Sequence, residues 1–156
     1  MIDMSNEIIK TGESFGEFEL KAHDGKLFSS KEHKGKKILL SFHPLAWTSV
    51  CRDQMVQLDE RYDDFLSKGV IPVGVSVDPV PSKGAWAESI GIKQLKLLSD
   101  FWPHGELAEK LGIFNEEGGF SNRVNLILDE DRKVFWSKIY PIKQVPDFQE
   151  VLDILK

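Results

Sequence analysis

The chain has 156 residues, of which 41% are hydrophobic and 29% charged, and its formal net charge is −5. This composition is typical of an ordinary globular protein, and we expect a single domain over residues 1–156. Basic residues are scattered and no apolar run approaches the ~18 residues of a membrane helix, which argues against binding to nucleic acid or membranes. The start, MIDMSNEIIK, does not match a secretory signal. Because one cysteine cannot form an internal disulfide, we expect a cytoplasmic protein.

The predicted elements alternate between strands and helices. A hairpin is expected over residues 18–29, with Asp24-Gly25 in its turn. Short apolar runs predict strands at 38–42, 70–77, 95–98, 124–128 and 134–140. Helical spacing of apolar residues predicts helices at 49–66, from the Pro79–Pro81 segment to Gly91, at 103–111 and at 145–155. This order indicates an α/β fold with a mixed sheet and helices on both faces.

Cys51, the only cysteine, ends the stretch HPLAWTSVC at residues 43–51. It lies on one helical stripe with Met55 and Leu58, which favours a buried core residue. Thr48 is a natural N-cap, however, and would place the sulfur in the first helical turn. Unpaired N–H groups and the helix dipole favour a thiolate at such a position. The residues alone leave both interpretations open, and they exclude a C-x-x-C dithiol motif.

A nearby cation would further stabilise a thiolate. The chain has four arginines, and three of them are expected on a polar helix face, in a hairpin turn or pointing away from the sulfur: Arg61, Arg132 and Arg52. Arg123 instead opens a buried-type strand after the loop 118–122. A charged residue there usually faces solvent or a carboxylate, but by elimination Arg123 is the best candidate to reach inward.

Pro44, Thr48 and Cys51 form the pattern P-x-x-x-T-x-x-C, which resembles the active-site signature of the peroxiredoxins. The order of the other segments agrees: DGK, GKKILLSF, IPVGVSVD, and an arginine that opens a strand ending near Asp129. Residues 97–119, LLSDFWPHGELAEKLGIFNEEGG, look like the AhpE-type branch of one-cysteine peroxiredoxins. The resemblance implies a thioredoxin-like fold with an N-terminal β-hairpin extension.

The resemblance also implies four catalytic residues. Cys51 would attack the terminal oxygen of a hydroperoxide and become a sulfenic acid. Thr48 would hydrogen-bond the thiolate and the peroxide, and Pro44 would shield the sulfur from water. Arg123 would stabilise the thiolate and the charge that develops on the oxygens, a type of interaction worth about 2.7–4 kcal/mol per donor in a comparable site.

Three positions depart from the usual family pattern. Gln54 stands where many members carry Glu, so it can keep hydrogen bonds but not a charge. His43 precedes the motif proline in place of Phe or Tyr, and either a backbone hydrogen bond or an active-site role would explain it. Trp47 replaces the more usual Phe and can cover a pocket, although ordinary packing is the commoner role of such an aromatic residue. His43 and Trp47 are therefore candidate substrate-binding residues.

The leading hypothesis is a thiol-dependent peroxidase that reduces hydrogen peroxide and organic hydroperoxides. An outside thiol would regenerate Cys51: thioredoxin, a glutaredoxin-like protein or a low-molecular-weight thiol. The alternative is a peroxide sensor or chaperone-like module with little turnover. A Cys51–Cys51 bridge between subunits is a further possibility, and the resemblance implies a homodimer or higher oligomer. The spacing of His, Cys and Asp residues predicts no metal site, and no cofactor is expected.

Overall fold

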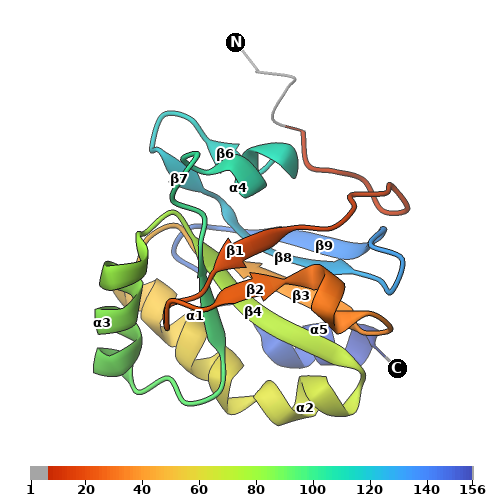
Figure 1. Cartoon of the computed structure of the whole chain (residues 1–156), viewed down its shortest axis with the longest axis horizontal. Coiled ribbons are helices and arrows are strands. Elements are labelled where there is room, and N and C mark those ends of the chain that lie inside the picture. The colour runs from red at the N-terminus through yellow and green to blue at the C-terminus, as the bar shows by residue number, and fades with distance from the viewer. Residues whose placement is uncertain (1–6, 156) are drawn as a thin grey trace.

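A five-stranded mixed sheet forms the centre of the molecule, with the strand order β5-β4-β3-β8-β9 (Figure 1). The structure is a computed structural model that describes residues 7–155. The parallel strands are β3 (Lys37–Phe42), β4 (Val70–Ser76) and β5 (Lys96–Ser99), and the antiparallel ones are β8 (Arg123–Leu128) and β9 (Val134–Tyr140). All five predicted strands are confirmed, with ends that differ by at most one residue.

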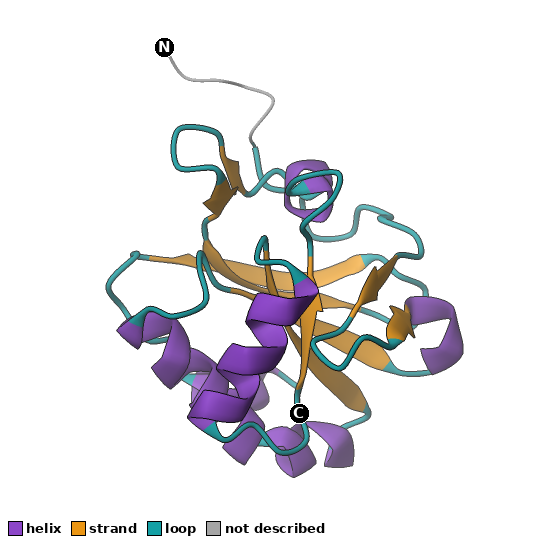
Figure 2. Ribbon diagram, turned by 60° about the vertical axis from the view of Figure 1, so that its left-hand side comes forward, coloured by secondary structure: helices purple, strands orange, loops and turns teal. Residues whose placement is uncertain are grey.

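Four helices cover one face of the sheet, and Figure 2 shows the longer ones gathered on one side of the strands. They are α1 (Ser49–Glu60), α2 (Tyr62–Ser67), α3 (Val80–Ile90) and α5 (Phe148–Ile154). Leu39, Leu97 and Ile127 pack against them from the sheet. Two crossover connections, β3-α1-α2-β4 and β4-α3-β5, join the parallel strands, as parallel pairing requires.

The opposite face is covered by the N-terminal hairpin and α4. The elements are β1 (Glu19–Lys21), β2 (Leu27–Ser29), the 3-10 helix η2 (Ser30–His33) and α4 (Glu106–Lys110). Their apolar residues pack on Leu40, Phe42 and Val124. The predicted hairpin extension and the helices on both faces are thus confirmed. A small hairpin of β6 (Phe114–Asn115) and β7 (Phe120–Ser121) was not predicted.

Three predicted helices have different bounds. The one predicted at 145–155 spans only Phe148–Ile154. The helix predicted at 49–66 is interrupted at Arg61, whose backbone leaves the helical conformation. The helix predicted at 103–111 begins only at Glu106. Asp100 sets this start, because its carboxylate accepts hydrogen bonds from the N–H groups of Leu107 and Ala108 at 3.0 Å each. A carboxylate from the preceding strand end, rather than Pro103, therefore begins α4.

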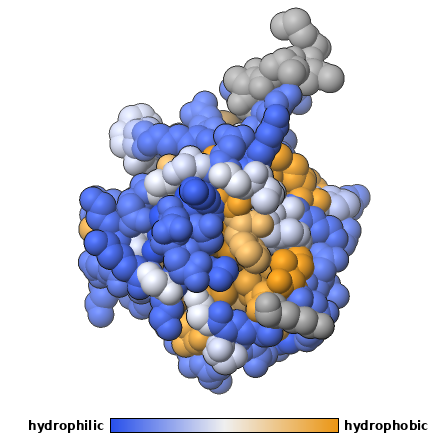
Figure 3. Space-filling view, turned by 90° about the vertical axis from the view of Figure 1, so that its right-hand side faces the viewer, coloured by the Kyte–Doolittle hydropathy of each residue, from blue (hydrophilic) through white to orange (hydrophobic). Residues whose placement is uncertain are grey.

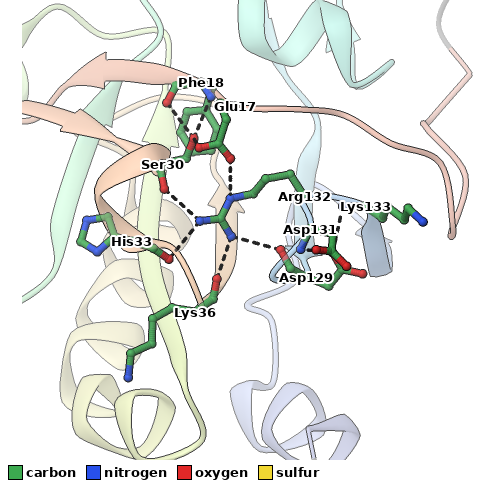
Figure 4. A network of polar contacts seen from close by, with 9 residues as sticks. All are labelled: Glu17, Phe18, Ser30, His33, Lys36, Asp129, Asp131, Arg132 and Lys133. Carbon is green, nitrogen blue, oxygen red and sulfur yellow. Dashed lines mark hydrogen bonds and ion pairs between the residues drawn. The ribbon is translucent and has the colours of Figure 1, made fainter.

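Arg132 joins the N-terminal hairpin to the turn between β8 and β9 (Figure 4). Although the sequence placed it in an ordinary polar turn, its side chain is buried and its backbone φ is +61°. Its guanidinium donates five hydrogen bonds, to the carboxylate of Glu17 and to the backbone carbonyls of Ser30, His33, Lys36 and Asp129. Such complete pairing compensates the cost of burying the charge.

The edge strand β9 leaves apolar side chains in contact with solvent. Figure 3 shows apolar residues gathered on this side of the molecule and surrounded by polar ones. The large hydrophobic side chains that β9 exposes are Phe135 and Ile139. Within residues 7–155, no helix has the length and hydropathy needed to cross a membrane. The prediction that the chain does not start with a secretory signal concerns residues 1–10, and the first six of these lie outside the described part of the chain.

Candidate active site

Cys51 is the third residue of α1, so its sulfur lies in the first turn of the helix. The side chain is 1% exposed and packs in the same cluster as Met55 and Leu58. Both expected placements are therefore found, because the residue is part of the core stripe and part of the helix start. The N–H groups of a first turn have no partner within the helix, and they favour negative charge on a nearby atom.

Thr48 occupies the N-cap position, with an extended backbone at φ −111° and ψ 152°. The predicted helix start is thus confirmed, but the threonine does not cap the helix with its side chain. Its hydroxyl instead donates a hydrogen bond of 2.8 Å to the carbonyl of Leu45, three residues earlier. This bond closes the loop before α1 and leaves the lone pairs of the threonine oxygen free to accept a hydrogen bond.

Arg123 reaches the sulfur from the start of β8. Its Nη1 lies 3.3 Å from the Sγ of Cys51. The carbonyl of Ile142, just beyond β9, holds the other side of the guanidinium by accepting from Nε at 3.1 Å and from Nη2 at 2.6 Å. The side chain is 2% exposed, so little water screens its charge. The inward orientation inferred by elimination is therefore found in the structure.

Gln54 completes the contacts of the arginine. Its Oε1 accepts from Nη1 of Arg123 at 2.7 Å, and its Nε2 donates to Ser41 Oγ at 2.8 Å and to the carbonyl of Phe42 at 3.2 Å. The amide thus orients the guanidinium without adding a negative charge. Among the described residues, no carboxylate forms an ion pair with Arg123.

A cavity of about 310 Å³ opens onto Cys51 and Arg123. Its wall is mostly apolar and also includes polar groups and one exposed lysine: Pro44, Leu45, Thr48, Ser49, Val50, Asn115, Phe120, Ile142 and Lys143. The unpredicted β6–β7 hairpin supplies Asn115 and Phe120. This space is within the size range of small-molecule sites, and its apolar wall suits the organic part of a ligand.

The four predicted catalytic residues Pro44, Thr48, Cys51 and Arg123 all border this cavity. His43 and Trp47 do not. Trp47 has a left-handed backbone, with φ at +70°, and its indole N–H donates to Ser82 Oγ on α3 at 3.0 Å. Its ring is 57% exposed and lines a separate hollow between α1 and α3.

His43 is fully buried beneath the loop that precedes α1. Its Nε2 lies 3.3 Å from Nζ of Lys83, and its ring packs 5.4 Å from that of Trp86. Burial is the main cause that lowers the pKa of His43 well below its usual value, and the charges of Lys83 and Arg123 add to this effect. The imidazole is therefore neutral at physiological pH.

Lys83 was not predicted as a residue of the site, although its helical spacing could have indicated that it is buried. It lies on the inward face of α3 with Trp86 and Ala87, at helical spacing. A lysine on an apolar stripe is unusual, because lysine is almost never fully buried unless it is paired. Lys83 is 0% exposed.

Comparison with known proteins agrees with this geometry. A family model described as the AhpC/TSA family matches residues 11–137. The chain belongs to the AhpC/TSA family. Alkyl hydroperoxide reductase E of Mycobacterium tuberculosis is 30% identical over 141 residues, which cover 90% of this chain and 92% of that protein. A peroxiredoxin of Pyrococcus abyssi is 31% identical over 156 residues, covering 96% of this chain and 71% of that protein.

Solved structures of AhpC/TSA proteins have the same fold. AhpC of Enterococcus faecalis superposes with a TM-score of 0.84 at 25% identity, over 93% of this chain and 89% of that chain. The thioredoxin-like fold implied by the sequence is thus confirmed. The single cysteine and the likeness to alkyl hydroperoxide reductase E agree with the one-cysteine branch. Within residues 7–155, no group of three or more His, Cys, Asp or Glu side chains is placed to hold a metal ion.

Proposed function

We propose that this chain is a thiol-dependent peroxidase that reduces hydrogen peroxide and organic hydroperoxides. The observation that carries the proposal is the 3.3 Å contact between Arg123 Nη1 and Cys51 Sγ at a cavity next to the first turn of α1. Membership of the AhpC/TSA family supports it, as do relatives named alkyl hydroperoxide reductase E and peroxiredoxin.

In the first step, the Cys51 thiolate attacks the terminal oxygen of the hydroperoxide. The O–O bond breaks as the S–O bond forms, so the sulfur is oxidised to a sulfenic acid and the peroxide is reduced. The leaving oxygen departs as hydroxide or alkoxide and takes up a proton to give water or an alcohol. Negative charge therefore moves from the sulfur to the leaving oxygen, and fixed donors aimed along this path lower the barrier.

The residues around the cavity have complementary roles in this step. Arg123 Nη1 faces the sulfur, so the guanidinium stabilises the thiolate and the oxygens that replace it. Because the Thr48 hydroxyl donates to Leu45, its oxygen accepts the O–H of the incoming hydroperoxide and turns the terminal oxygen toward the sulfur. Pro44 is buried and contributes no N–H group, so it forms a dry wall.

In the second step, outside thiols restore the cysteine, because the chain has no second cysteine. One thiol attacks the sulfenic sulfur and releases water, and a second thiol resolves the mixed disulfide to regenerate Cys51 and a disulfide product. The reductant is thioredoxin, a glutaredoxin-like protein or a low-molecular-weight thiol. It reaches the buried sulfur through the cavity.

The test is rapid mixing of reduced protein with hydrogen peroxide or an alkyl hydroperoxide. Wild type should gain one oxygen on Cys51, detected by mass spectrometry, and should consume one equivalent of peroxide in a burst. Cys51→Ser keeps the side-chain size and should show neither change. A Cys51→Ser variant that consumed peroxide as fast as wild type would disprove the proposal.

Steady-state turnover separates the enzyme from a peroxide sensor. With each candidate reductant supplied in excess, a peroxidase consumes many equivalents of peroxide for each protein chain. A sensor gives a single burst with every reductant. The panel of reductants therefore identifies the physiological class of thiol in the same experiment.

We also propose that the protein is cytoplasmic and forms a homodimer or a higher oligomer. The apolar side chains of the edge strand β9 support self-association, because exposed strand edges pair readily. Light scattering of reduced and oxidised protein should give a mass of at least two chains. A non-reducing gel after peroxide treatment tests for a Cys51–Cys51 bridge, and the burial of the sulfur predicts little of it.

A further inference from the structure

Lys83 on α3 is a completely buried amine with neutral direct partners. Its Nζ donates to Ser76 Oγ at 2.6 Å and lies 3.3 Å from Nε2 of His43. Among the described residues, no carboxylate lies within ion-pair distance of it. A buried ammonium without a counter-ion is costly, so neither ordinary packing nor an ion pair explains this residue.

The contacts of this lysine lead to the loop between β3 and α1. Ser76 Oγ donates to Asp78 Oδ2 at 2.6 Å, and the same carboxylate oxygen accepts the N–H of Ala46 at 2.8 Å. The amine therefore contacts the loop at two points, directly at His43 and through this chain at Ala46. These two residues flank the segment 44–45, which lines the cavity of Cys51.

Several ionisable groups surround the amine. They are His43 at the end of β3, Cys51 on α1, Asp78 after β4, Asp100 after β5 and His23 in the turn between β1 and β2, with Arg123 of β8 beyond His43. The pKa of His23 is lowered, mainly by burial. His43 is neutral, for the reasons given above. The anions that act on the amine are thus two carboxylates and the Cys51 thiolate.

The charge of Lys83 responds to these anions. Burial lowers the pKa of Lys83 to about 7, while the charges of Asp78, Cys51 and Asp100 act in the opposite direction. Electrostatic coupling is reciprocal: if a thiolate at Cys51 favours the ammonium, then the ammonium favours the thiolate to the same extent.

We infer that Lys83 is a positioning residue of the Cys51 site: from α3 it supplies a second buried positive charge, besides that of Arg123, that favours the thiolate. The consequence for peroxide reduction rests on the proposed function. Lys83 does not touch the cavity, so it acts through the field at the sulfur and through the loop that it contacts.

The test compares the pH profile of Cys51 alkylation by iodoacetamide in wild type, Lys83→Met and Lys83→Arg. Methionine keeps the length of the side chain without its charge, and arginine keeps the charge. The alkylation midpoint of Lys83→Met should move to higher pH by about half a unit to one unit, or about three- to tenfold slower alkylation below the midpoint. Lys83→Arg keeps its charge at every pH of the profile, so its midpoint should lie no higher than that of the wild type.

Two further variants separate charge from structure. Lys83→Gln can still donate to Ser76 but has no charge, so it should move the midpoint as far as Lys83→Met does. Lys93→Met removes the same charge from an exposed position just after α3, and it should leave the midpoint unchanged. Unchanged midpoints in both Lys83→Met and Lys83→Gln would overturn the inference, even if their rates fell, because a purely structural defect lowers rates without moving the profile.

Alkylation does not depend on peroxidase activity, so the two proposals can fail separately. If the wild type reacts with peroxide and the alkylation midpoints do not move, the role of Lys83 is overturned and the proposed peroxidase function stands. If the midpoints move but the protein does not react with peroxide, the charge coupling between Lys83 and Cys51 is supported and the proposed function is overturned.

Discussion

Replacing the buried Lys83 by methionine should stabilise the protein at neutral pH. In the folded protein burial lowers the pKa of this lysine from 10.5 to about 7. Above its unfolded pKa of 10.5 the amine is neutral in both the folded and the unfolded chain. Below that pH the unfolded chain binds a proton that the folded chain does not, so stability is lost as the pH falls to about 7. At pH 7 the difference between the two pKa values corresponds to about 4 kcal/mol that the wild type loses and Lys83→Met does not.

Part of this gain is offset in the variant. Methionine leaves the hydroxyl of Ser76 and Nε2 of His43 without their hydrogen bonds to the amine, at a cost of about 1–2 kcal/mol. The net expectation is an increase of about 2–3 kcal/mol in the free energy of unfolding at pH 7. The pH dependence of this stability difference is more informative than its value at pH 7, because the lost hydrogen bonds cost the same at every pH.

Urea unfolding of the reduced proteins, followed by tryptophan fluorescence, measures both quantities. The stability gap between Lys83→Met and wild type should shrink by about 3 kcal/mol between about pH 6 and about pH 9. Lys93→Met, which changes an exposed lysine, should give no such trend. A gap that stays constant over this range would refute the reasoning, since it would mean that the amine titrates alike in the folded and unfolded chains.

Three further substitutions test other contacts. Arg123→Met should slow sulfenic acid formation by about 10²- to 10³-fold in stopped-flow fluorescence, whereas Arg52→Met, an exposed arginine on α1, should keep the wild-type rate. Gln54→Leu should lower the free energy of unfolding by about 2 kcal/mol, because it leaves buried polar groups unpaired; an unchanged urea midpoint would contradict this. Arg132→Met should cost about 3 kcal/mol and speed hydrogen exchange over residues 17–36, and equal exchange there would show that the hairpin does not depend on this arginine.

Much of the fold could be predicted because the buried strands are short apolar runs bounded by polar turns. The segments 38–42 and 124–128 pair with each other at the centre of the sheet, where both faces are covered. The start of α1 was predictable from Thr48, because the N-cap preference depends on backbone position and local polarity. What its hydroxyl does was not, since the competing acceptor, the Leu45 carbonyl, becomes available only when the loop folds.

Features that depend on distant contacts could not be read from the chain. The start of α4 is set by the carboxylate of Asp100, which belongs to the end of a strand. The indole of Trp47 turns away from the cavity because Ser82, on another helix, accepts its hydrogen bond. Arg123 was found by elimination, whereas Lys83 was overlooked although its helical spacing with Trp86 placed it on an apolar face.

The amide at position 54 has a consequence for the reaction cycle. The cluster of Cys51, Gln54 and Arg123 carries one positive charge while the sulfur is a thiol, and none once it is a thiolate. Oxidation to a neutral sulfenic acid restores the positive charge, because Gln54 offers nothing to cancel it. The site is thus more attractive to anions directly after the peroxide has reacted than it is in the thiolate form. The reductant attacks as a thiolate, which is an anion. The positive charge of the site after the first step therefore attracts the thiol that carries out the second step.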